Sequence, residues 1–174
     1  DRIGAMDERG NFVDPHKIMT LAMRYLVEER GLRGPAVRTV STTRMIDRLA
    51  MEHNLAVDET AVGLNYIADY MLKEEILIGG EESGGISFQG HIPEGDGSLM
   101  ALLLIEMVSK LGVSLSDLVE DLVSKYGPVH YQRTDLRLSQ PISKAQMTRQ
   151  LTEEKPPHIG GNAVVEVQSV DGVK

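Results

Sequence analysis

The 174-residue sequence contains no cysteine, which excludes disulfides, thiol catalysis and cysteine-ligated zinc. This absence fits a reducing compartment, so we expect a cytoplasmic protein. No run reaches the roughly 18 apolar residues of a membrane-spanning helix, because the densest apolar stretch, 99–105, ends at Glu106. The first residues also lack the apolar core of a signal peptide. We therefore expect no membrane partner.

Positive charge is scarce as well. Lysine and arginine number 18 against 26 aspartates and glutamates, which gives a formal net charge of −8. A protein that binds nucleic acid needs a basic surface to displace phosphate counterions, so we expect no nucleic-acid partner. The apolar fraction of 41% and the charged fraction of 25% are those of an ordinary globular protein.

Strand and helix signals alternate along most of the chain, which predicts an α/β fold. A helix is expected from Asp14, an N-cap residue followed by proline. Ser41–Thr43 are interpreted as helix caps in preference to a phosphate site, and Asp96 is interpreted as the cap of the helix that follows it. The segment 99–111 is apolar on nearly all faces, which predicts a helix packed deep in the domain.

The pattern changes near residue 127, where we place a domain boundary. A half-exposed strand is expected at 129–139, and short strands at 164–167 and 170–173. The tail of about 47 residues is too small to hold a core alone. We therefore predict one α/β domain over 1–127 and a C-terminal extension over 128–174.

A glycine-rich segment, 79–85, lies between two predicted strands and is the feature that folding alone explains least. It holds four glycines, two glutamates and a serine. Glycine lets a ligand approach the backbone closely, and carboxylate and hydroxyl groups suit the hydroxyls of a sugar. The segment is acidic and lacks the Gly-Lys-Ser/Thr of a phosphate-binding loop. A mobile hairpin turn explains the same residues equally well, so both interpretations stay open.

A metal site at the nearby loop is disfavoured. His91, Glu94 and Asp96 lack a recognised ligand spacing, and a solvated loop is the simpler interpretation.

The segment GGEESGGISFQGHIPEGDG at 79–97 closely resembles the α-D-phosphohexomutases, the phosphoglucomutase/phosphomannomutase family. TVSTTRMIDRLA at 39–50, ETAVGLNYI at 59–67 and VDGVK at 170–174 follow in the order of that family. The resemblance implies a three-layer α/β/α domain with a mainly parallel, mixed sheet. This would be the third of four domains, followed by a short C-terminal extension that enters the fourth.

The resemblance also implies an enzyme, an intramolecular phosphotransferase that interconverts hexose 1-phosphate and 6-phosphate. Such enzymes use a phosphoserine, a bisphosphate intermediate and Mg²⁺. The implied partners are a phosphorylated hexose and the other domains of the same chain. The serine motif is absent here, so no catalytic residue is expected in this sequence, and the isolated chain is expected to be inactive. Glucose, mannose and glucosamine remain equal candidates for the sugar.

Matched to the family motifs, Gly80, Glu81, Ser83 and Gly84 resemble the sugar-binding loop. The resemblance implies that Glu81 and Ser83 contact the sugar hydroxyls. The first residue, Asp1, would then be a metal ligand at the end of a truncated magnesium loop.

Arg2 would complete the same loop, and no bound Mg²⁺ is expected in so short a part of it. Two positions depart from the family pattern: Asn65 stands where lysine is usual, and Gly95 where arginine is usual. Both departures remove positive charge. They slightly favour an alternative, a non-catalytic sugar-phosphate-binding or interaction module on the same fold. An ordinary α/β domain with a decorative loop is a third interpretation.

Overall fold

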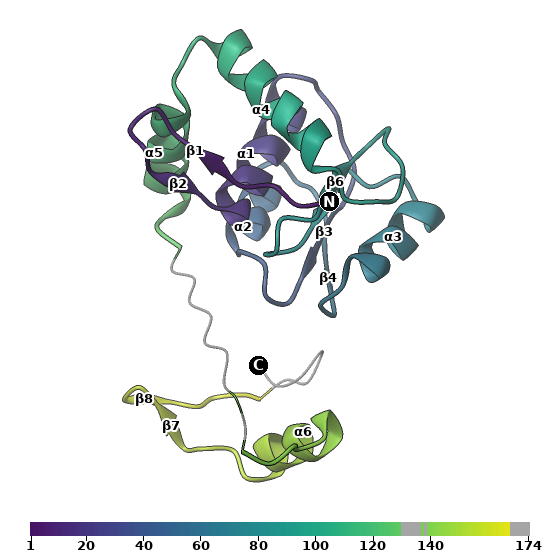
Figure 1. Cartoon of the computed structure of the whole chain (residues 1–174), viewed down its shortest axis with the longest axis vertical. Helices are drawn as coiled ribbons and strands as arrows, with labels where there is room; N and C mark the ends of the chain where they lie inside the picture. Colours follow the sequence, from purple (N-terminus) through teal and green to yellow (C-terminus); the bar gives the residue numbers. More distant parts are fainter. Residues whose placement is uncertain (130–136, 138, 168–174) are drawn as a thin grey trace. The chain divides into compact units, whose positions relative to one another are not determined.

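A computed structural model describes residues 1–129, 137 and 139–167 and divides the chain into two units, Asp1–His130 and Tyr131–Lys174. The first unit is built on four strands: β3 (Ala36–Thr39), β4 (Val57–Thr60), β5 (Ile78–Gly80) and β6 (Ile86–Phe88). They form one sheet in the order β4-β3-β5-β6 (Figure 1). The first three strands run parallel and β6 pairs antiparallel with β5, so the sheet is mixed as predicted.

Helices cover both faces of this sheet. They are α1 (Pro15–Glu28), α2 (Met45–Glu52), α3 (Leu64–Lys73), α4 (Gly97–Leu111) and α5 (Leu115–Tyr126). The helix α1 contacts α2, α4 and α5, and the main hydrophobic core lies among them. The helix α3 lies on the other face of the sheet (Figure 1), where its Ile67 forms a second cluster with Val37 and Ile76. The predicted three-layer α/β/α fold is therefore confirmed.

The start of α1 is the one expected. The carboxylate of Asp14 accepts a hydrogen bond from the backbone N–H of Lys17 at 3.0 Å, and Pro15 occupies the first turn. The start of α2 differs from the prediction, because its N-cap is Arg44 and no side chain caps it there. Of the three predicted caps, only Thr43 bonds the helix, accepting from Met45 N at 3.1 Å.

The helix α4 is not buried on all faces, so that prediction is wrong. Met100, Leu103 and Met107 point into the core, whereas Leu102 and Ile105 are 63% and 65% exposed. Apolar composition alone does not tell how many layers cover a helix. Among the described residues, only one side of α4 is covered.

The described residues contain no single helix that is long and apolar enough to cross a membrane. Within the described part of the chain, α4 and α5 taken together meet that test, but they are bent by 89° where they meet.

An N-terminal hairpin precedes α1, with strands β1 (Ala5–Met6) and β2 (Phe12–Val13). The second unit contains α6 (Lys144–Glu153), β7 (His158–Ile159) and β8 (Asn162–Ala163).

The strands of the second unit lie elsewhere than predicted. Residues 164–167 form no strand, and the hairpin lies at 158–163 instead. Its turn is Gly160-Gly161, with φ of 55° and 83°, the positive values that a two-residue hairpin turn requires. The predicted strand 129–139 falls mostly outside the described residues, and 170–173 falls wholly outside them.

Candidate functional site

Three loops meet where the parallel strands end. β3, β4 and β5 are followed by the loops 40–43, 61–63 and 81–85. The pairing of Arg38 with both Glu59 and Gly80 brings the three strand ends to one level. Ligands of open α/β sheets bind outside these carboxyl ends, so the predicted sugar loop lies at the favoured edge.

The loop 81–85, called the tip below, is a closed turn. The backbone N–H of Glu81 donates to Gly85 O and that of Gly84 donates to Glu81 O, both at 3.0 Å. Gly84 has φ +99°, and a Cβ there would lie 2.6 Å from the carbonyl oxygen of Ile3. Only glycine satisfies both the backbone angle and this close approach.

The two glycines of β5 are explained by packing. A Cβ on Gly80 would lie 2.9 Å from the sulfur of Met19 in α1, and one on Gly79 would collide with Ile67 in α3. Their absent side chains let both helix layers approach the sheet. The polar contact of Gly80 is made by its carbonyl oxygen, which accepts from the Thr42 hydroxyl at 3.4 Å.

Glu81 and Ser83 form a pair at the tip. The Ser83 hydroxyl donates to Oε1 of Glu81. The second carboxylate oxygen, Oε2, is buried and accepts no hydrogen bond from any described residue. A buried carboxylate oxygen without a donor is costly, so the site suits a ligand that brings a hydroxyl or an N–H group.

Glu82 turns the other way, toward the loop after β3. Its Oε2 accepts from the Ser41 hydroxyl at 2.6 Å and more weakly from Thr39 at 3.4 Å. Sequence reasoning assigned Ser41 to helix capping and missed this contact. The signal that would have found it is the run of hydroxyl side chains at 39–43, because it ends a strand parallel to β5 and so meets the tip at one edge.

His16, at the start of α1, is 4% exposed. Burial lowers the pKa of this imidazole, while the carboxylates of Asp14 and Glu82 act in the opposite direction. The net lowering favours the neutral form, so His16 adds little positive charge beside the acidic tip.

The first residues of the chain run past the tip. The backbone N–H of Ile3 donates to Gly84 O at 3.2 Å, and the amino group of Asp1 donates to Gly95 O at 2.6 Å. Asp1 and Arg2, far from the tip in sequence, are thereby brought to the same region as the predicted sugar loop.

The two departures from the family pattern differ in setting. Gly95 is buried, and a Cβ there would lie 3.0 Å from Leu64 Cδ2 and 3.1 Å from the Cα of Gly85. Asn65 is exposed in the first turn of α3. An added Cβ is therefore a tight fit at Gly95, whereas the side chain of Asn65 is open to solvent.

The described residues do not assemble a complete magnesium site by themselves. No three His, Asp or Glu side chains gather to hold a metal anywhere in the described part of the chain. The Asp1 carboxylate accepts from the N–H of Arg2 at 2.8 Å. Asp96 caps α4 as predicted, accepting from Leu99 N at 2.9 Å, and that hydrogen bond lowers the pKa of its carboxyl group.

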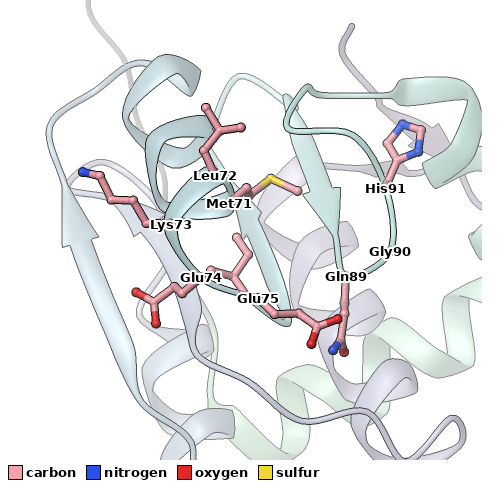
Figure 2. A pocket seen from close by; sticks show the side chains of 9 residues that line it. Met71, Leu72, Lys73, Glu74, Glu75, Gln89, Gly90 and His91 are labelled. Carbon is pink, nitrogen blue, oxygen red and sulfur yellow. The ribbon is translucent and has the colours of Figure 1, made fainter.

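A polar pocket of about 400 Å³ lies at the other end of the β5–β6 hairpin. Figure 2 shows it between the end of α3 and the loop after β6, with Glu75, Gln89 and His91 among its lining side chains. The strand register places this pocket away from the tip, so it does not include the predicted sugar-contacting residues.

Comparison with known proteins gives this arrangement a family. The sequence profile of "Phosphoglucomutase/phosphomannomutase, alpha/beta/alpha domain III" matches residues 14–126. A phosphoglucosamine mutase from Ruminiclostridium cellulolyticum is 37% identical over 120 residues, which are 68% of this chain and 26% of that protein. The chain thus spans about a quarter of the length of such curated relatives.

Solved structures agree. A Thermus thermophilus protein classed as a phosphomannomutase superposes with a TM-score of 0.69 at 36% identity, covering 72% of this chain and 29% of that one. A phosphoglucomutase/phosphomannomutase family protein from Burkholderia thailandensis, 19% identical, shares the fold with a TM-score of 0.72 over 99% of this chain and 34% of its own. The chain therefore belongs to the phosphoglucomutase/phosphomannomutase family, and residues 14–126 are its α/β/α domain III.

Proposed function

We propose that this chain is the sugar-orienting part of an enzyme that interconverts hexose 1-phosphate and hexose 6-phosphate. The family assignment and the mutase names of the relatives support this activity. Because the chain spans only about a quarter of those relatives, the activity belongs to a larger protein. Within it, we assign 1–127 to the third domain and 128–174 to the connection into a fourth, and we place the enzyme in the cytoplasm.

The observation that carries this proposal is the hydrogen bonding of the Glu81 carboxylate. One carboxylate oxygen is fixed by Ser83, and the other is buried without a donor among the described residues. A hexose ring offers vicinal hydroxyls, one of which can donate to the free oxygen of Glu81 while another donates to the oxygen of Ser83, whose own proton is given to Glu81. The charge-assisted hydrogen bond to Glu81 would be the stronger of the two.

The chemistry of the intact enzyme follows from the family. A phosphoserine outside this chain would transfer its phosphoryl group to the free hydroxyl of the hexose phosphate, giving a bisphosphate. The bisphosphate would turn around and return its other phosphoryl group to the serine. Glu81, Ser83 and the backbone of Gly80 and Gly84 would hold the ring hydroxyls in both orientations, which is a positioning role. We assign the Mg²⁺ of this enzyme to a loop that Asp1 and Arg2 would end, with its other ligands outside the described residues.

Replacement of Glu81 tests the assignment in the intact enzyme. Loss of one charge-assisted hydrogen bond costs about 1.5–3 kcal/mol, so Glu81→Ala should lower kcat/KM about 10–100-fold. The assay should include the phosphates of glucose, mannose and glucosamine. Glu75→Ala is the matched control, because this exposed carboxylate lies at the other end of the hairpin and should leave kcat/KM unchanged. Wild-type kinetics in Glu81→Ala would refute the role of Glu81.

Titration of the 174-residue chain with glucose 1-phosphate, followed by NMR, separates the proposal from its alternatives. Shifts centred on 81–84 support a sugar-contacting tip, and their absence at saturating ligand supports an α/β domain with an unrelated loop. Binding by an intact protein that turns over none of the three sugar phosphates would identify a non-catalytic module. The departures at Asn65 and Gly95 favour that module to a small degree, since both remove positive charge.

A further inference from the structure

The tip carries two glutamates, and the structure separates their environments. Glu81 pairs with Ser83 of its own turn, whereas Glu82 reaches across to the loop that follows β3. Gly84 N bonds Glu81 O, which makes Glu82 and Ser83 the two central residues of the turn. The side chain of Glu82 is thus bonded to the loop after β3, while the side chain of Ser83 is bonded to Glu81.

The hydroxyl groups of Thr39, Ser41 and Thr42 form a cluster that bonds Glu82. Thr39 Oγ1 lies 2.8 Å from the Thr42 hydroxyl and 3.2 Å from the Ser41 hydroxyl. Thr42 also donates to Gly80 O, the last carbonyl before the tip. Thr39 and Thr42 are 0% and 5% exposed, so packing fixes the cluster in place. It contacts the tip at its corner and at its base.

Proton counting identifies Ser41 as the main donor to Glu82. Each hydroxyl has one proton to give. The Ser41–Glu82 separation of 2.6 Å is typical of an O–H···O⁻ hydrogen bond, while Thr39 stands 3.4 Å away and has Thr42 as a nearer partner. Among the hydrogen bonds of the described residues, removal of the Ser41 hydroxyl would therefore leave Glu82 only the weak one from Thr39.

We infer that Ser41 and Glu82 form a latch that holds the tip in the conformation in which Glu81 and Ser83 face a ligand. Glu82 is a positioning residue, not a ligand contact, and Ser41 is its partner. The consequence for catalysis rests on the proposed function, but the latch itself is a property of this chain. No covalent step is involved.

Amide hydrogen exchange measured by NMR on the 174-residue chain tests the latch without any ligand. The amides of Glu81 and Gly84 report on it, because both donate hydrogen bonds inside the turn. Losing a hydrogen bond to a charged group shifts an opening equilibrium by about tenfold or more. Ser41→Ala should accelerate exchange at both amides about tenfold while leaving that of Ala36 in β3 unchanged.

Ser87→Ala is the matched control. Its hydroxyl donates to Ile92 O from β6 of the same hairpin and has no contact with Glu82. It should leave the exchange rates of the tip amides unchanged. Glu82→Ala provides a second variant, because this side chain is only half-buried and its loss is compatible with folding. It should match Ser41→Ala, and the double variant should be no faster than either single one.

Unprotected tip amides in the wild type, or equal exchange in the wild type and Ser41→Ala, would overturn the latch. In the intact enzyme, Ser41→Ala should lower kcat/KM about tenfold, and Glu82→Gln, which keeps an acceptor oxygen, should remain within about threefold. A larger loss in Glu82→Gln than in Ser41→Ala would make Glu82 a ligand contact and reject the positioning role. Faster tip exchange together with normal kinetics in Glu81→Ala would instead refute only the proposed function.

Discussion

Arg38 shows how a single buried charge organises the strand ends. Arg38 is 1% exposed, and its guanidinium donates to both carboxylate oxygens of Asp47 at 2.7 and 2.8 Å and to Glu59 at 2.7 Å. These contacts join β3 to the start of α2 and to β4. The exposed Arg44 stands at 3.4 Å from Asp47 and 3.3 Å from Glu59, so it adds a weaker, solvent-screened contribution.

Replacement of Arg38 should therefore be far more costly than replacement of Arg44. Arg38→Met leaves two partly buried carboxylates without their main partner, and we expect the free energy of unfolding to fall by about 3 kcal/mol. Arg44→Met should lower it by about 0–1 kcal/mol. Urea denaturation of both variants gives the comparison. Equal losses would show that the buried guanidinium has no special structural role.

At the scale of elements, α4 shows that an apolar helix is not necessarily a buried one. Its inner side chains join the main core, while Leu102 and Ile105 face outward. An apolar pocket of about 440 Å³ lies between this helix and the N-terminal residues 3–6. An exposed apolar face of this kind does not stabilise the chain itself, but it promotes association.

The double variant Leu102→Gln/Ile105→Gln should thus leave the free energy of unfolding within about 0.5 kcal/mol of wild type, because both side chains are already in water. The concentration at which the chain self-associates should rise, as measured by light scattering. Leu103→Ala, on the buried side of the same helix, is the contrast and should cost about 2–5 kcal/mol. A similar loss in the double variant would mean that the outward face is covered after all.

At the scale of the whole molecule, the stability of the chain resides in its first unit. The main core draws on residues from Val13 to Tyr126, and the second cluster packs α3 against the other face of the sheet. The second unit has no comparable centre among its described residues, since α6 buries none of its side chains. Both the family match and the core thus lie within the first unit.

A chain ending at residue 130 should consequently fold alone. We expect one cooperative thermal transition, with a Tm within about 2–4 °C of the full chain, since every core side chain among the described residues lies before residue 130. Circular dichroism at 222 nm measures it. A broad, non-cooperative transition in the shortened chain would show that the first unit needs the extension.

The sequence by itself determined those features that depend on local backbone chemistry. The Asp14 cap with its proline, the Asp96 cap and the glycine-bearing turn after β5 are all readable from neighbouring residues, and the structure has them. The alternation of strand and helix signals was likewise enough for the α/β class, because hydrophobic periodicity is a local property.

Only the tertiary structure decided which distant groups meet. Serine is a residue type typical of helix caps. The hydrogen bond that Ser41 donates to Glu82 instead depends on β3 and β5 being adjacent in the sheet. The approach of Met19 from α1, which accounts for the missing side chain of Gly80, is likewise visible only in the structure. The exposure of Leu102 and Ile105 on α4 could not be predicted from the sequence either. Burial depends on the elements that cover a residue, and sequence periodicity does not record which elements do so.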